Sequence, residues 1–286
     1  MSTEKIDTIK TPPANGADKK RTNVFGNCAN MFVKLYHHAC SVFFPSHIKC
    51  IVCGEDLKQK QDIEVCDKCQ CKLHKITESE CCARCGAVVP GQGKYCLNCQ
   101  NTDREFDVAR SVFVYENEVK RLIAGLKYNN KPYLSRTLSN YLAELYKSLD
   151  WQVDLIIPVP LSKKRKEWRG YNQAELLADG LSDAVGVPLN TETLVKIKDT
   201  DSQTHLSMVE RRNNLRESFK VMDKYAVRGK KILLVDDVMT TGATANACAN
   251  VLKKAHADRV LVLTIAHGLQ EIPAENRLND SKNGNN

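Results

Sequence analysis

Residues 231–244 combine an apolar run, two adjacent carboxylates and a turn rich in threonine. The apolar run 231–235 predicts a strand that delivers Asp236 and Asp237 to the carboxyl edge of a sheet. A helix is expected to begin at about Gly242, so its first backbone N–H groups would face an anion with the positive end of the helix dipole. The residues expected to bind a phosphate are Thr240, Thr241, Gly242, Ala243 and Thr244. Because the two carboxylates can accept hydrogen bonds from vicinal hydroxyls, the segment predicts a site for a phosphorylated pentose.

A second segment, residues 157–173, combines a strand end with a run of positive charge. The strand closes on Pro158 and Pro160, and five cations follow within residues 163–169. Backbone N–H groups and cations of this kind can bind pyrophosphate. The candidate residues are Pro160, Leu161, Lys163, Arg165 and Arg169. A solvated basic loop is the alternative, because runs of charge are usually solvated.

Eight of the 13 cysteines form four pairs with the spacing Cys-x-x-Cys. The pairs are Cys50 with Cys53, Cys66 with Cys69, Cys82 with Cys85, and Cys96 with Cys99. Two such turns close a tetrahedral zinc site, so each half of the set predicts a zinc-ribbon unit, with one or two structural zinc ions in all. Gly54 and Gly86 follow their pairs where the chain must turn sharply. A site of four thiolates leaves no position for water, so the predicted role is structural.

The remaining cysteines have less specific interpretations. Cys71 and Cys81 lie beside the pairs as spare thiols, although a shifted ligand set could use Cys71 or His74. Cys28, Cys40 and Cys248 are isolated and are expected to be small buried hydrophobes.

The elements that position these residues alternate between strands and helices after residue 107. Strands are expected at 108–115, 155–159, 194–197, 231–235 and 259–265, and helices at 118–127, 132–149, 172–184 and 242–254. Such alternation requires crossover connections, so the predicted fold class is α/β, with a largely parallel sheet covered on both faces. The polar stretch 203–216 is expected to be a flexible hood that covers the bound sugar.

Composition divides the 286 residues into five parts. These are a disordered, mildly basic leader (1–23), an amphipathic helix (24–49), a double zinc-ribbon module (50–100), an α/β domain (101–270) and a flexible tail (271–286). We expect the helix to dock on its own protein rather than on a membrane or a partner. No apolar run reaches the roughly 18 residues that a membrane span needs, and no secretion signal is evident. Clustered thiols in such a chain indicate metal binding in the cytoplasm.

The run 231–244 resembles the phosphoribosyl pyrophosphate (PRPP) signature of type I phosphoribosyltransferases. Together with Arg169–Ala178, Leu206–Leu215, the lead helix and the double Cys-x-x-Cys module, it resembles the ComF/ComFC family of competence proteins. The resemblance implies a type I phosphoribosyltransferase-like sheet preceded by a small zinc-ribbon domain. It also implies that Asp236 and Asp237 hold the ribose, that Thr240–Thr244 hold the 5′-phosphate, and that Mg²⁺ accompanies PRPP.

The family resemblance implies a cytoplasmic protein of DNA uptake that binds single-stranded DNA and retains a PRPP site. Its partners would include PRPP or a nucleotide, a competence helicase and a recombination mediator. An active phosphoribosyltransferase, transferring ribose 5-phosphate to a nucleobase or related acceptor, is the alternative. Purine-salvage enzymes of the hypoxanthine-guanine type carry an aspartate where this chain has Thr240, so a general base is missing there. A PRPP-sensing regulator that reads duplex DNA is a third hypothesis, but no segment resembles a helix-turn-helix.

Overall fold

The computed structural model describes residues 49–269, except 60, 90, 92, 199–214 and 216. These residues belong to one compact unit that begins at His47. The predicted leader, lead helix and tail, with Cys28 and Cys40, lie outside the described residues apart from Lys49. The predicted hood, residues 203–216, also lies outside the described residues, apart from Leu215.

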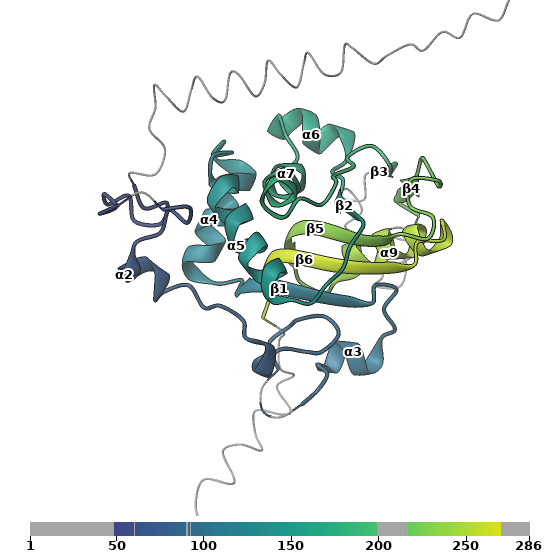
Figure 1. Cartoon of the computed structure of the whole chain (residues 1–286), viewed down its shortest axis with the longest axis horizontal. Coiled ribbons are helices and arrows are strands. Elements are labelled where there is room, and N and C mark those ends of the chain that lie inside the picture. Colours follow the sequence, from purple (N-terminus) through teal and green to yellow (C-terminus); the bar gives the residue numbers. More distant parts are fainter. Residues whose placement is uncertain are drawn as a thin grey trace, which may run out of the picture. The chain divides into compact units, whose positions relative to one another are not determined.

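Four parallel strands form the central sheet in the order β1-β6-β5-β2 (Figure 1). The strands are β1 (Val108–Val114), β2 (Leu155–Pro158), β5 (Lys231–Met239) and β6 (Arg259–His267). All three pairings are parallel, which confirms the predicted sheet. Alternate residues of β5 face opposite cores, with Leu233 and Val235 in one and Ile232 and Leu234 in the other. The sheet is therefore buried on both faces, as a parallel sheet requires.

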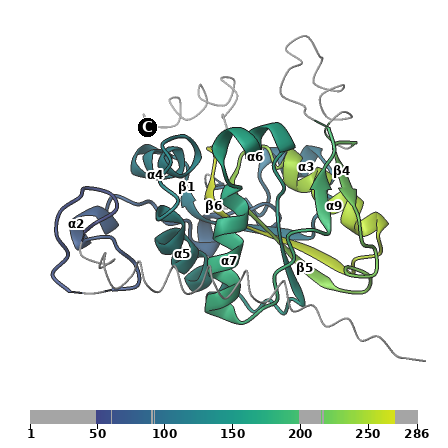
Figure 2. The same ribbon diagram turned by 90° about the horizontal axis from the view of Figure 1, so that it is seen from above.

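Helices cover the two faces unequally. One core contains residues of α4 (Asn117–Tyr128), α5 (Leu134–Ser148) and α7 (Gln173–Val185), whereas the other contains α9 (Ala243–Lys254). Figure 2 shows α5 and α7 side by side on their face. In α4, Val119, Leu122, Ile123 and Leu126 are buried at the spacing of one helix face. The periodicity that predicts these four helices also determines which side of each is buried.

Three local features differ from the sequence predictions. Strand β5 continues to Met239, because β6 extends to His267 and keeps pairing with it. The cationic run forms a short helix, α6 (Lys163–Arg169), rather than a loop. Its residues are mostly good helix formers, and the helix ends at Gly170, which has a φ of 82°. The predicted strand β3 (Leu194–Lys196) pairs antiparallel with β4 (Phe219–Val221), a strand of three residues that was not predicted.

The cysteine-rich region covers the outer edge of β1. It contains the short elements α2 (Asp67–Gln70), η1 (Glu78–Glu80) and α3 (Leu97–Asn101). Between the two cysteine groups, Ile76 N donates to Val112 O at 2.9 Å and Val114 N donates to His74 O at 2.9 Å. The chain therefore protects an edge strand that would otherwise expose unpaired backbone groups.

The two cysteine groups contribute to different cores. Cys50 and Cys69 belong to the core of α4, α5 and α7, whereas Cys82 and Cys85 belong to the core of α9. The stretch 101–107, which has the composition of a linker, contains the buried Phe106 and is packed. The two cysteine groups thus bracket the edge of the sheet and stabilise it from both faces.

Candidate functional site

The two predicted carboxylates lie within the last part of β5, beyond the end of β2. Strand β2 ends at Pro158, which is in register with Val235. On the other side, Asp236 remains in register with Thr264 of β6. Val159 N donates to Val235 O at 2.9 Å, so the chain after β2 leaves the sheet beside the carboxylates. The structure therefore brings together the two segments that the sequence singles out.

Asp237 forms an ion pair that no sequence pattern predicted. Its Oδ1 lies 2.7 Å from Lys127 Nζ, and the side chains are 3% and 19% exposed. Burial alone would lower the pKa of Lys127, but the carboxylates of Asp237 and Asp236 raise it above its ordinary value. The other oxygen, Asp237 Oδ2, is buried without a hydrogen-bond partner. A buried carboxylate oxygen of this kind is available to a donor group or a cation of a ligand.

Asp236 differs from its neighbour in its electrostatics. Burial and the adjacent Asp237 carboxylate raise the pKa of Asp236 to about 7. Lys127 and the Asp237 backbone N–H, which donates to Asp236 Oδ1 at 2.8 Å, oppose this rise. At neutral pH, Asp236 is therefore poised between its protonated and ionised forms.

The threonine-rich turn forms a hollow next to Asp236. The hollow is lined by Asp236, Val238, Met239, Thr240, Thr241, Gly242, Ala243, Thr244, Ala245 and Thr264. Gly242 has a φ of 74°, and a Cβ there would lie 3.3 Å from Met239 Cε, so the turn has little room for a side chain. Arg104 Nη1 donates to Thr241 O at 2.9 Å. Helix α9 begins at Ala243 with no acidic residue in its first turn, which suits an anion at that end.

The predicted pyrophosphate residues divide between a partly buried turn and an exposed helix. Pro160 and Leu161 are half-buried beside the end of β5, whereas Lys163 and Arg165 are exposed on α6. Arg169 donates to Gln173 Oε1. The sequence interpretation missed Ser162, whose buried Oγ has no hydrogen-bond partner. Its place immediately before a cationic helix is the signal that could have identified it.

The segment after α6 holds these parts in place. Asn172 caps α7 by accepting from Ala174 N at 3.1 Å, and its Nδ2 donates to Val159 O at 3.1 Å. Tyr171 donates its hydroxyl to Leu126 O at 2.6 Å. These bonds join the end of β2 to the end of α4, next to Lys127. The residues of 169–173 thus position the site.

Each group of four predicted cysteine ligands comes together in space. One group consists of Cys50, Cys53, Cys66 and Cys69, and the other of Cys82, Cys85, Cys96 and Cys99, with the ligand atoms of each group within 4.8 Å of one another. A tetrahedron with Zn–S bonds of about 2.3 Å has sulfur atoms about 3.8 Å apart. The Sγ atoms of Cys53 and Cys66 are 3.7 Å apart and those of Cys85 and Cys96 are 3.5 Å apart. Both groups therefore fit a tetrahedral metal ion.

The pKa of one thiol in the second cysteine group also favours metal binding. A hydrogen bond from the Cys85 thiol, with further bonds from backbone N–H groups, lowers the pKa of Cys82 to about 4 against the effect of burial. One thiolate is thus present at neutral pH, and thiolates are the form that binds zinc. The glycines that follow the pairs have the expected turn geometry, with φ of 81° at Gly54 and 73° at Gly86.

The other described cysteines lie outside both groups. Cys71 is exposed and Cys81 is buried, and neither belongs to a set of four sulfurs. The ring of His74 instead faces two carboxylates: its Nδ1 lies 3.5 Å from Glu116 Oε1, and its Nε2 lies 3.8 Å from Glu80 Oε1. The unshifted ligand sets are therefore the ones that the fold assembles. Cys248 is fully buried on α9, as expected for an isolated cysteine.

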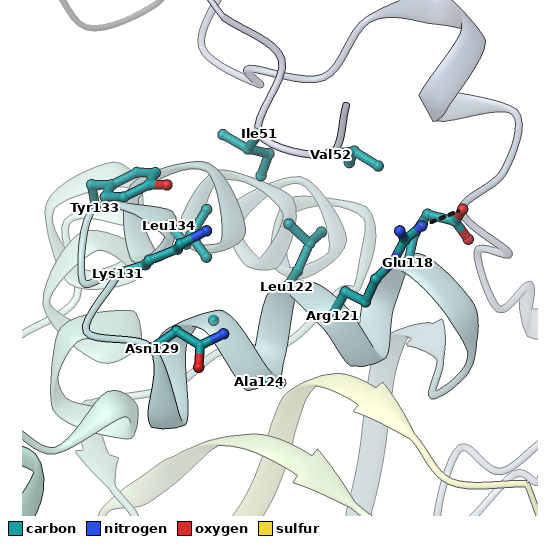
Figure 3. Close-up of a pocket in the computed structure, with 11 residues that line it drawn as sticks. Ile51, Val52, Glu118, Arg121, Leu122, Ala124, Asn129, Lys131, Tyr133 and Leu134 are labelled. Atoms are coloured by element: carbon teal, nitrogen blue, oxygen red, sulfur yellow. Dashed lines mark hydrogen bonds and ion pairs between the residues drawn. The ribbon is translucent and has the colours of Figure 1, made fainter. Parts of the chain in front are cut away.

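A separate cavity of about 330 Å³ lies between the first cysteine group and the helices α4 and α5. Figure 3 shows Ile51 and Val52, the two residues between Cys50 and Cys53, facing Leu122 and Leu134 across it. An ion pair of 2.8 Å between Arg121 and Glu118 lies at its rim. Its lining contains none of the predicted sugar or phosphate residues. Ile51 and Val52 also pack against the core of α4, α5 and α7, so the first cysteine turn contacts the helical layer through apolar side chains.

Residues 128–279 match the phosphoribosyl transferase domain family, so the fold and site define a protein of the phosphoribosyltransferase type. Competence protein F of Haemophilus influenzae is 31% identical over 226 residues, which is 77% of this chain and 97% of that protein. Competence protein ComFC of Bacillus subtilis is 29% identical, over 76% of this chain and 93% of that protein. The chain therefore belongs to the ComF/ComFC family, and its own cysteine groups, which fit zinc ribbons, precede its phosphoribosyltransferase-type domain.

Solved structures with similar folds include a glutamine PRPP amidotransferase from B. subtilis complexed with ADP and GMP. That match has 20% identity and a TM-score of 0.35, and it covers 46% of this chain and 26% of that chain. Among the residues that the structure describes, no helix has the length and apolar character needed to cross a membrane.

Proposed function

We propose that this protein binds PRPP with Mg²⁺ in the hollow beside Asp236 and Asp237, and that it binds single-stranded DNA during DNA uptake. The proposal places it in the cytoplasm, with a competence helicase and a recombination mediator as partners. The relatives named Competence protein F, ComFC and DNA utilization protein YhgH support a role with DNA. The observation that carries the PRPP proposal is the hollow that Asp236 and the threonine turn line at the end of β5, with the Asp237 carboxylate next along the strand.

In this proposal each part of PRPP has its own partners. The ribose hydroxyls donate to Asp236 and Asp237, whose buried Oδ2 would gain the partner that it lacks. The 5′-phosphate accepts hydrogen bonds from the backbone and hydroxyls of Thr240–Thr244. The pyrophosphate lies against Pro160, Leu161 and the buried Ser162, with charge from Lys163, Arg165 and Arg169. When Mg²⁺ is bound, it would neutralise charge on the pyrophosphate group.

Calorimetric titration tests the PRPP part of the proposal. Wild-type protein in Mg²⁺ should bind PRPP, and the double variant Asp236→Ala, Asp237→Ala should lose measurable binding. Asp223→Ala, at an exposed aspartate between β4 and β5, is the matched control and should bind as the wild type does. Equal binding by the double variant and the wild type would refute the site.

The salt dependence of DNA binding tests the second part. Affinity for a single-stranded oligonucleotide should fall with rising salt, with a slope of about 0.7 per phosphate contacted. Weak binding even at low salt would refute a role in holding single strands.

The match to the phosphoribosyl transferase domain family favours one alternative, an active phosphoribosyltransferase. In that reaction the bond from C1 of the ribose to pyrophosphate breaks, a bond from C1 to a ring nitrogen of the acceptor forms, and the acceptor loses a proton to a base. Thr240 offers no carboxylate for that proton, so another group must serve as the base. Pyrophosphate release that depends on an added nucleobase would support this activity, and its absence with every nucleobase and nucleotide would exclude it.

A further inference from the structure

Two exposed aromatic rings and a guanidinium group meet next to the candidate site. Tyr128 ends α4, and Trp168 and Arg169 end α6. The ring centroids of Tyr128 and Trp168 are 6.3 Å apart, with an angle of 55° between the ring planes. The guanidinium carbon of Arg169 lies 5.3 Å from the centroid of the Tyr128 ring. Side chains about 40 residues apart in the sequence therefore form one cluster.

Both rings leave most of their surface in solvent. Trp168 is 69% exposed and Tyr128 is 62% exposed, whereas the second tryptophan, Trp151, packs against the core. Tryptophan side chains are usually well buried. A pair of large rings that stays exposed therefore indicates a binding surface rather than a role in core packing. Arg169 is held by its bond to Gln173, so this member of the cluster is positioned before any ligand arrives.

The charge around the cluster selects the kind of partner. Helix α6 carries five cations and one carboxylate, a net charge of +4, and Lys163, Lys164 and Arg165 on it are exposed. Two of its cations have acidic neighbours. Lys163 Nζ lies 3.9 Å from Glu167 Oε1, and Lys166 Nζ lies 2.9 Å from Glu175 Oε2. Aromatic faces combined with excess positive charge bind single-stranded nucleic acids, because bases stack on the rings and phosphates meet the cations. A duplex hides its base faces and does not fit this arrangement.

We infer that Tyr128, Trp168 and Arg169 form a stacking platform for the bases of single-stranded DNA, with the cations of α6 along the phosphates. The inference rests on the proposed binding of single-stranded DNA, and it names the surface of the protein that binds the strand. Lys127, which precedes Tyr128, contacts Asp237. The platform thus begins one residue along α4 from the ion pair with Asp237.

Tryptophan fluorescence tests the platform directly. The chain has two tryptophans, so Trp151→Phe leaves Trp168 as the single reporter. Titration with a (dT)15 oligonucleotide should quench this fluorescence, because a stacked base quenches indole emission. An abasic strand of the same length keeps the phosphates and lacks the bases, and it should bind more weakly with little quenching.

Affinity measurements with variants provide the second arm. Trp168→Ala should weaken (dT)15 binding by about 5- to 150-fold, the range found for loss of one base-stacking ring, with little change in the salt slope. Trp168→Phe should restore most of the affinity. Tyr225→Ala, at a ring that is 85% exposed between β4 and β5, is the matched control and should bind as the wild type does. PRPP binding should be unchanged in Trp168→Ala, which shows that the variant is folded.

The outcomes separate this inference from the proposed function. Normal (dT)15 affinity in Trp168→Ala, or equal binding of the abasic strand, would overturn the platform and leave DNA binding elsewhere on the protein. If dTMP binds at Trp168 as tightly as (dT)15, the cluster is a single-nucleotide subsite and the inference is wrong. If the wild type fails to bind (dT)15 at low salt, the proposed DNA function fails and the platform fails with it.

Discussion

Lys127→Met is the substitution that most sharply tests the electrostatics of the site. Methionine keeps most of the length of the lysine side chain and removes its charge. The change leaves the Asp237 carboxylate, which is 3% exposed, without the ammonium group 2.7 Å away. Its other oxygen already lacks a hydrogen-bond partner. The folded protein would therefore contain a buried and uncompensated carboxylate.

The expected cost follows from the burial of the two partners. Breaking a fully buried ion pair from one side costs about 3–5 kcal/mol of unfolding free energy. Because the Lys127 side chain is 19% exposed, its ammonium keeps part of its hydration, and we expect a loss of about 2–3 kcal/mol. Adding Asp237→Asn removes the stranded charge and should recover at least half of that loss.

The coupling energy is measured by urea unfolding at pH 7.5 with zinc present. The double-mutant cycle compares the wild type, Lys127→Met, Asp237→Asn and the double variant. Lys131→Met, at an exposed lysine on the turn after α4, is the control and should change stability by less than about 0.5 kcal/mol. A coupling energy below about 0.5 kcal/mol between Lys127 and Asp237 would refute the buried pair.

Two further predictions concern protons and metal. Because the pKa of Asp236 is about 7 when folded and 3.8 in the reference state, its contribution to stability is full below about pH 4 and is lost as the pH rises through 7. As the pH rises from 5.5 to 8.5, Asp236→Asn should therefore gain about 2 kcal/mol of stability relative to the wild type, and a constant difference across that range would contradict the raised pKa. Mass spectrometry should find two zinc ions in the wild type and in Cys71→Ser but one in Cys82→Ser, and two ions in the last variant would rule out the ligand set.

The sequence predicted the parallel sheet and the ligand groups because short-range patterns determine them. Burial periodicity in α4 and the apolar runs of β5 and β6 depend on residues close together in the chain. The spacing of the cysteine pairs likewise fixes which sulfurs can share one metal ion. These features needed no knowledge of distant contacts.

The structural features that the sequence analysis did not predict depend on contacts between distant segments. Nothing near Lys127 marks it as the partner of Asp237, which is 110 positions away. The length of β5 depends on how far β6 runs beside it, and Met239 pairs with His267. The meeting of Tyr128 with Trp168 depends on how α4 and α6 end in space. Local propensity cannot supply such long-range information.

A crystal structure with PRPP and Mg²⁺ tests the central claim most directly. The account predicts density for the 5′-phosphate within hydrogen-bonding distance of the backbone of Thr240–Thr244, with the ribose hydroxyls on Asp236 and Asp237. The pyrophosphate should lie toward Pro160 and Ser162. An empty hollow at saturating PRPP, or PRPP bound elsewhere on the protein, would contradict the account.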